Sequence, residues 1–174
     1  IRASGEENAA GIAAFGKAFS LLQRVGMDVI REEERKLTAS LLQRLSLLPG
    51  IRVHGIKDPS SSRFSEKLGV VAFDVKSKSS KSVARHLALE SGIGVRWGCH
   101  CAHIIIKHLI GLGPFVEGFQ RVIQITFPRF RFLGVVRVSL GIENSEQEII
   151  TLENALKKII HSSKGSSSGE KRAV

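Results

Sequence analysis

Apolar residues recur every three or four positions in several segments of the chain, which predicts amphipathic helices. The first segment ends near Gly26, and the second runs from Met27 to a stop at Pro49-Gly50. A final helix begins with the capping-box sequence Ser145-Glu-Gln-Glu148, and shorter helices are expected over residues 79–91 and 102–110. The positions that form the three long stripes are Ile12, Phe15, Phe19 and Leu22; Ile30, Leu37, Leu41, Leu45 and Leu48; and Ile149, Leu152, Leu156 and Ile159.

Three local patterns refine these helices. The charged run Arg31-Glu-Glu-Glu-Arg-Lys36 is expected to be a solvated face with ion pairs four residues apart. The consecutive isoleucines Ile104-Ile-Ile106 predict burial of the short helix over residues 102–110. Residues 162–174 are rich in Ser and Gly without apolar periodicity, so we expect this tail to be disordered.

Short runs rich in β-branched residues lie between the helices and predict strands. These runs cover residues 51–53, 69–75, 93–96 and 135–140, and a polar loop over residues 57–67 separates the first two. We therefore expect an α/β fold, with a small mixed or antiparallel sheet covered by helices on one side. A chain of 174 residues is long enough for one compact domain with its own core.

Candidate chemistry gathers at the ends of the last two strands. The sequence Arg96-Trp-Gly-Cys-His-Cys101 leaves the third strand, and Arg137 stands in the middle of the fourth. A charge inside an apolar strand is costly unless it is paired or faces a ligand. Guanidinium groups grip carboxylates by parallel hydrogen bonds, and cationic neighbours favour the reactive thiolate of cysteine. This composition is typical of a reaction centre that handles a small carboxylate.

Other interpretations of these residues stay open at the level of sequence. Cys99 and Cys101 can be small buried hydrophobes, and Arg137 can pair with a core acid. Cys99-His100-Cys101 with His103 and His108 can also bind zinc, although the spacing lacks the usual two-residue gap and a second knuckle, so no metal is expected. A Cys99–Cys101 disulfide would close a strained short ring, which favours reduced thiols.

The net charge of +10 is unevenly distributed. Residues 91–142 hold six Lys or Arg against the single acid Glu117, and five phenylalanines between Phe115 and Phe132 alternate with arginines. Basic and aromatic residues in alternation are also found in single-stranded nucleic-acid platforms, which is the non-enzymatic alternative. No apolar run reaches the roughly 18 residues of a membrane span. A cytoplasmic location is the default expectation, with an organelle left open because the chain begins at Ile1.

Taken together, these motifs resemble the C-terminal portion of class V aminotransferase-like enzymes, a pyridoxal-phosphate-dependent superfamily that contains the cysteine desulfurases. The resemblance covers residues 5–160. The segments that carry it are Ser4-Gly-Glu-Glu-Asn-Ala-Ala-Gly-Ile12, Gly26-Met27, Pro49-Gly-Ile-Arg-Val53, Gly92-Ile-Gly-Val-Arg96, Gly98, His100-Cys101-Ala102, Val136-Arg-Val-Ser-Leu140 and Asn144-Ser-Glu146.

The resemblance implies a role for each matching residue. Cys101 matches the nucleophile that takes sulfur from the substrate cysteine, with His100 as a proton carrier beside it. Arg137 matches the arginine that binds the substrate carboxylate, and Arg96 matches a second active-site arginine. Cys99 replaces a residue that is often histidine.

Cofactor binding would involve residues near the start of the chain. Gly5 and Asn8 match a cofactor-contact motif, Gly-Thr-x-Asn, in which Glu6 replaces the threonine and would repel a phosphate. The stretch between Cys101 and Arg137 is also longer than in well-known desulfurases. Transaminase or lyase chemistry on an amino acid is the alternative within the family.

The resemblance also implies a larger enzyme around this chain. Residues 1–26 would be an interdomain helix region, residues 27–161 the small C-terminal domain of a fold-type I enzyme, and residues 162–174 a tail. The lysine that forms the Schiff base with pyridoxal 5'-phosphate would lie in a preceding large domain. Expected partners are an amino-acid substrate, that large domain, a second subunit in a homodimer and a sulfur-acceptor protein, but neither a membrane nor nucleic acid.

Overall fold

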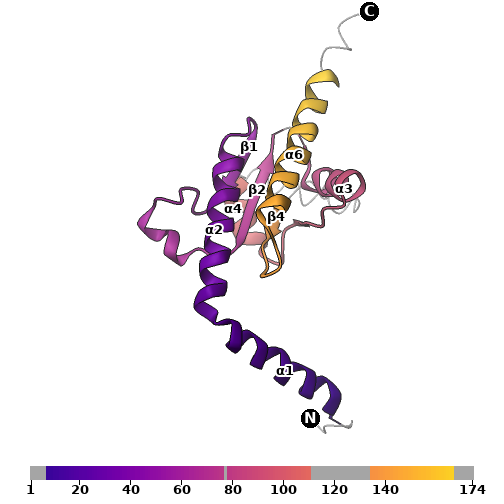
Figure 1. The fold of residues 1–174 in the computed structure, drawn as a ribbon. Helices are drawn as coiled ribbons and strands as arrows, with labels where there is room; N and C mark the ends of the chain where they lie inside the picture. Colours follow the sequence, from indigo (N-terminus) through magenta and orange to yellow (C-terminus); the bar gives the residue numbers. More distant parts are fainter. Residues whose placement is uncertain (1–6, 77, 111–133, 167–174) are drawn as a thin grey trace, which may run out of the picture.

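The computed structural model describes residues 7–76, 78–110 and 134–166, which form a four-stranded sheet with helices packed on it (Figure 1). The elements follow one another in the order α1 (Ala9–Val25), α2 (Met27–Ser46), β1 (Ile51–His54), the 3-10 helix η1 (Ser62–Glu66), β2 (Val70–Val75), α3 (Ser80–Ser91), β3 (Arg96–Gly98), α4 (His103–Ile110), β4 (Val135–Ser139) and α6 (Glu146–Ser166).

The strands lie in the order β1-β2-β4-β3, and each neighbouring pair is antiparallel. This confirms the expected α/β fold and selects the antiparallel form of its sheet. Because side chains alternate between the two faces of a strand, each strand presents one apolar face and one mixed face. Val71 and Phe73 of β2 and Val136 of β4 are fully buried on the first face.

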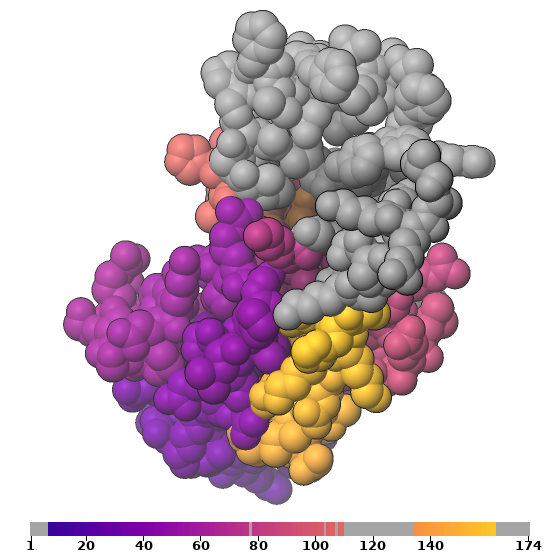
Figure 2. Space-filling view, turned by 90° about the horizontal axis from the view of Figure 1, so that it is seen from above, coloured from indigo at the N-terminus to yellow at the C-terminus, as the bar shows by residue number. Residues whose placement is uncertain are grey.

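Helices α2, α3 and α6 cover the apolar face of the sheet. In Figure 1, α2 and α6 lie side by side in front of the strands, and Figure 2 shows the same two segments adjoining when seen from above. Their apolar stripes merge with the strands into one core, as the periodicity predicts. The apolar helical residues buried most completely are Leu41, Leu42, Leu45, Val83, Leu87, Ile149 and Leu156.

A polar cluster joins α2 to α6 at the rim of this core. Arg44 Nη1 donates to Glu153 at 2.6 Å, and its Nη2 donates to Glu146 at 2.9 Å. The Ser40 hydroxyl also donates to Glu146, at 2.6 Å. Hydrogen bonds from Ser40 and Arg44 lower the pKa of Glu146 below its ordinary value, and those from Lys157 and Arg44 do the same for the pKa of Glu153.

Helix α1 projects away from the body of the molecule (Figure 1). Gly26 separates it from α2, because its φ of 91° lies in a region that side chains rarely adopt. No residue of α1 is buried, and Ile12, Phe15 and Phe19 on its predicted stripe are exposed. The predicted helix is thus confirmed, while the apolar face that defines it contacts no core among the described residues.

Two expectations for the segment around the third strand are wrong. The strand predicted over residues 93–96 is β3, Arg96–Gly98, because only these residues match partners on β4. Gly92 takes the left-handed cap of α3 at a φ of 64°, and residues 92–95 stay off the ladder. In α4, Ile106 is buried, but Ile104 and Ile105 are exposed, since one helical face meets the core and three consecutive residues cannot share it.

Two further expectations are corrected at the helices themselves. The charged run of α2 forms pairs three residues apart, Glu32 with Arg35 and Glu33 with Lys36, rather than four. Helix α6 continues to Ser166, beyond the predicted start of the disordered tail at residue 162. Each residue added to an existing helix gains a backbone hydrogen bond at little cost. Residues 167–174 lie outside the described part of the chain.

Within the described ranges, no helix combines the length and apolarity that crossing a membrane requires.

Candidate active site

The two candidate arginines meet on the mixed face of the sheet. Arg96 of β3 and Arg137 of β4 are direct partners in the antiparallel register, so their side chains point to the same side. Arg137 is half-buried, and its Nε atom is buried without a hydrogen-bond partner among the described residues. Two like charges directly opposite each other are unfavourable. This arrangement is suited to an anion held between two guanidinium groups.

The neighbouring strands extend this row of residues. Ala72 of β2 lies opposite Arg137, and His54 of β1 lies opposite Ala72, so all four positions share one face. The short side chain of Ala72 leaves space beside Arg137. The alternative interpretation of Arg137, that it pairs with a core acid, finds no support in the described residues, because no ion pair joins it to one.

An acid on this face is already engaged by other partners. Asp74 stands diagonally from Arg137, a separation that long side chains can bridge. Its Oδ2 atom instead accepts from Arg52 Nη2 at 2.8 Å and contacts His54 Nε2 at 2.8 Å. Sequence reasoning missed this cluster. The signal was present in the alternation of β1 and β2, where Arg52, His54 and Asp74 occupy the positions that face away from the helices.

The two cysteines lie in a tight turn directly after β3. The carbonyl of Cys99 accepts the Ala102 N–H at 2.8 Å, and the two central residues, His100 and Cys101, have φ values of 50° and 59°. Positive φ at both positions defines a type I′ turn, which is uncommon for residues other than glycine, asparagine and aspartate. Cys101 is exposed and Cys99 is half-buried. The nucleophile candidate is therefore accessible.

His100 ties this turn to the strand that carries Arg137. Its Nε2 atom lies 3.3 Å from the carbonyl oxygen of Val135, which is two residues before Arg137 on the same face of β4. Two residues along a strand span about 6.6 Å. The turn that contains Cys99, His100 and Cys101 therefore lies against the start of the strand that carries Arg137. The Nδ1 atom of His100 is buried and has no partner in the described residues.

The pairing of β3 with β4 depends on the glycine at position 134. A Cβ atom on Gly134 would lie 2.4 Å from the Cα of Gly98, closer than any real contact. The backbones can approach this closely because Gly134 carries no side chain, whereas a Cβ atom on Gly98 would meet no atom within 4 Å. This approach holds the cysteine turn against β4.

Of the two predicted cofactor contacts, only Asn8 falls within the described residues. The Asn8 side chain accepts the Gly11 N–H at 2.9 Å and caps α1, and Gly5 lies outside the described residues. The phenylalanine and arginine alternation between residues 115 and 132 also lies outside them. Among the side chains described, no three His, Cys, Asp or Glu residues gather as they would around a metal ion.

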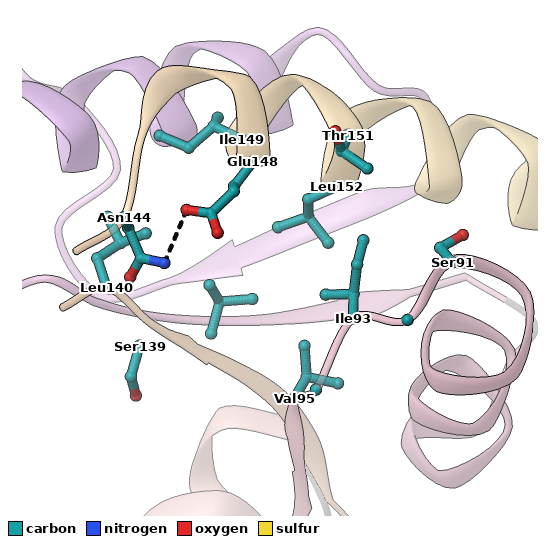
Figure 3. A pocket seen from close by; sticks show the side chains of 13 residues that line it. Ser91, Ile93, Val95, Ser139, Leu140, Asn144, Glu148, Ile149, Thr151 and Leu152 are labelled. Carbon is teal, nitrogen blue, oxygen red and sulfur yellow. Dashed lines mark hydrogen bonds between the residues drawn. The ribbon is translucent and has the colours of Figure 1, made fainter.

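A separate hollow of about 340 Å³ lies where residues 92–95 diverge from the end of β4 (Figure 3). Ile93, Val95 and Leu152 contribute apolar lining, and Asn144 and Glu148 point toward each other. The polar groups here are engaged in capping α6. Glu148 accepts from Asn144 Nδ2 at 2.9 Å and from the Ser145 N–H at 2.9 Å, which lowers its pKa. We assign this hollow no part in the reaction.

A sequence model of the family described as Aminotransferase class-V matches residues 2–152, most of the chain. The chain belongs to this family. Class V aminotransferases are pyridoxal-phosphate-dependent enzymes, and the resemblance seen in the separate motifs is thereby confirmed.

Relatives within the class V family include cysteine desulfurases. The cysteine desulfurase of Cronobacter sakazakii is 29% identical over 159 residues, which cover 90% of this chain and 31% of that protein. A probable cysteine desulfurase of Halalkalibacterium halodurans is 34% identical over 100 residues, covering 58% of this chain and 22% of that protein. This chain therefore spans about a third of the length of such relatives.

Solved structures show the same fold. The apo cysteine desulfurase of Thermococcus onnurineus NA1 matches 91% of this chain and 33% of its own, with a TM-score of 0.71 and 23% identity. The S-sulfonic acid form of the cysteine desulfurase CsdA from Escherichia coli matches 92% of this chain and 32% of its own, with a TM-score of 0.68 and 21% identity.

The described residues fit the part of a pyridoxal-phosphate site that contacts the substrate, and not the part that anchors the cofactor. The arginine pair and the exposed thiol suit a substrate that carries a carboxylate and a sulfur atom. Anchoring groups for the cofactor itself are not assembled beside them, because Asn8 is occupied as a helix cap. The described residues therefore offer groups suited to an anionic substrate, and no set of groups that would hold the cofactor is found among them.

Proposed function

We propose that this chain is the C-terminal part of a pyridoxal-phosphate-dependent cysteine desulfurase that mobilises sulfur from L-cysteine. The observation that carries the proposal is that Arg96 and Arg137 face each other across the ladder, with Arg137 Nε free of hydrogen bonds among the described residues, in the part of the sheet that the exposed Cys101 follows. A desulfurase needs a cationic clamp for the carboxylate of an amino acid and an accessible thiol for its sulfur. The desulfurase names of several relatives support the same assignment.

In this proposal the arginines orient the substrate. Arg137 binds the substrate carboxylate, and Arg96, its partner across the ladder, adds a second positive charge. The Cys101 thiolate attacks the substrate sulfur, a new S–S bond forms as the C–S bond breaks, and Cys101 keeps the sulfur as a persulfide. Bound pyridoxal phosphate supplies the electron sink that allows the C–S bond to break. Alanine is the other product.

His100 is suited to move a proton in this step. If Nε2 donates its hydrogen to the Val135 carbonyl, Nδ1 is the nitrogen that accepts a proton. His100 directly precedes Cys101 in the same turn, which supports this role. We propose His100 as the group that holds the proton released by the Cys101 thiol.

The exposed face of α1 supports the proposed organisation of the whole enzyme. Residues 1–26 connect a preceding large domain, which holds the Schiff-base lysine, to the small domain at residues 27–161. Phe15 is 74% exposed, and Ile12 and Phe19 lie on the same stripe. Apolar surface of this kind is normally covered by a partner. We propose that the large domain covers it, within a homodimer that delivers sulfur to an acceptor protein.

The decisive test uses the longer protein that carries this chain. It should release alanine and, with a reductant, sulfide from L-cysteine, and Cys101→Ala should abolish both products. Arg137→Lys should raise KM far more than it changes kcat, because a point charge replaces a bidentate clamp. Unchanged turnover in Cys101→Ala would favour a transaminase or lyase reaction. Salt-sensitive retention on single-stranded nucleic acid would favour the non-enzymatic alternative.

The chain alone should behave differently from the whole enzyme. Since we place the Schiff-base lysine outside it, the 174-residue chain should neither form a borohydride-trappable cofactor adduct nor turn over cysteine. Mass spectrometry after borohydride treatment checks this. A stoichiometric adduct on a lysine of this chain would contradict the proposed division of the site.

A further inference from the structure

The cysteine turn contains a second thiol that the proposed reaction does not use. Cys99 and Cys101 occupy the first and third positions of the type I′ turn closed by the bond from Ala102 N–H to the Cys99 carbonyl. Cys101 is exposed, whereas Cys99 is half-buried. Cys101 is therefore open to a substrate, and Cys99 lies two residues away in the same turn and is less exposed.

The conformation of the turn sets the distance between the two residues. In an extended chain, Cα atoms two positions apart are separated by about 6.6 Å. A residue in a helical conformation of either hand shortens this separation to about 5.4 Å. His100, at a φ of 50°, is such a residue. The two cysteines therefore fall near the most common Cα separation of disulfide-bonded pairs, well inside their range.

The strained backbone of this turn is held in place by its surroundings. Positive φ at both His100 and Cys101 is unfavourable, and such strain persists only where other contacts enforce it. The contact of His100 Nε2 with the Val135 carbonyl and the close approach of Gly98 to Gly134 supply that enforcement. An accessible thiol alone does not require this conformation, because any exposed loop would present it. A turn that shortens the separation of the two cysteines favours a reaction between their thiols.

We propose that Cys99 is a resolving thiol that releases sulfide from the persulfide on Cys101. This inference rests on the proposed function only for the origin of that persulfide. The Cys99 thiolate attacks Sγ of Cys101, and a bond forms between the two cysteine sulfurs. The bond from Cys101 Sγ to the outer sulfur breaks, and this sulfur leaves as hydrosulfide with the bonding electron pair.

The electrons of this step balance without an added oxidant. The outer sulfur gains two electrons as it becomes sulfide, and the two cysteine sulfurs lose them as they form the disulfide. A thiol or dithiol reductant must then return two electrons and two protons before the next cycle. The short ring of a Cys-x-Cys disulfide is strained, and strained disulfides are readily reduced. The disulfide is therefore a transient state.

The experiment starts from the reduced 174-residue chain and its Cys99→Ser and Cys101→Ser variants under nitrogen. Each is treated with limiting inorganic polysulfide, quenched by alkylation at increasing times, and analysed by intact-mass and peptide mass spectrometry. The wild-type chain should lose the mass of two hydrogen atoms and show a Cys99–Cys101 link. Cys99→Ser should instead retain one added sulfur atom on Cys101, with a lifetime at least about ten times longer.

Several outcomes would overturn the proposal. A wild-type persulfide that survives as long as the one on Cys99→Ser would show that Cys99 does not resolve it. An added sulfur atom that moves to Cys99 without sulfide release would show transfer instead of resolution. If the disulfide formed equally fast in denaturant and in the folded chain, the conformation of the turn would not be what promotes the reaction. None of these results affects the release of alanine from L-cysteine, which tests the proposed function separately.

Discussion

Replacing Arg137 by methionine should make the isolated chain more stable, because the arginine is placed for a ligand and not for the fold. Its Nε–H is buried without a partner in the described residues, and an unsatisfied buried donor costs about 1–3 kcal/mol. Arg96 directly opposite adds a repulsion of about 0.2–1 kcal/mol. Methionine keeps an unbranched apolar stem that fills similar space.

We therefore expect Arg137→Met to raise the free energy of unfolding by about 1–3 kcal/mol, or the midpoint temperature by several degrees. Urea titration followed by circular dichroism measures it. The matched control is Arg52→Met on the same face, which loses the 2.8 Å bond to Asp74 and should be neutral or slightly destabilising. A variant at Arg137 that is less stable than the wild-type chain would refute the reasoning.

An anion should narrow the difference in stability between the two proteins. A carboxylate that binds between Arg96 and Arg137 stabilises the folded wild-type chain by about 1.4 kcal/mol at ten times its dissociation constant. Acetate titrated at constant ionic strength should raise the wild-type midpoint and leave that of Arg137→Met unchanged. Equal shifts in both proteins would mean that the arginine pair does not bind the anion.

Three further predictions concern the fold around the site. The pKa values of Glu146 and Glu153 are lowered, so the contribution of these two carboxylates to stability is present above the ordinary glutamate pKa of 4.5. It is lost as the pH falls through the lowered values. In a plot of the urea midpoint against pH, replacing both residues by Gln should therefore reduce the fall of the midpoint at acidic pH. Leu156→Ala should cost about 2–5 kcal/mol in urea unfolding, whereas the exposed Leu89→Ala should change it by less than about 0.5 kcal/mol. Gly134→Ala should separate β3 from β4, seen as a loss of hydrogen-exchange protection at Trp97, and unchanged protection would contradict the glycine contact.

The family and the main helices and strands could be predicted from the sequence. Helical spacing located α1, α2, α3 and α6, because burial of one face imposes a period that a single chain displays. The motifs around Arg96, Cys101 and Arg137 indicated the class V family, which the match over residues 2–152 shows. The roles of Cys101, His100, Arg96 and Arg137 stay predictions that the proposed experiments test.

Other features depended on residues that are distant along the chain. The sequence placed the third strand at residues 93–96, but pairing with β4 and the approach of Gly98 to Gly134 set it at Arg96–Gly98. Ile104 and Ile105 are exposed, and the sequence around them does not indicate this, because exposure depends on which face of α4 packs against the core.

The sequence by itself determined which residues can do chemistry here, since guanidinium, thiol and imidazole groups are properties of single side chains. Only the tertiary structure decided how they meet. Ladder register made Arg96 the partner of Arg137, and it brought Asp74 to Arg52 and His54 instead of to Arg137. Register is set by which strands lie side by side, and a shift of one residue would turn every side chain to the opposite face.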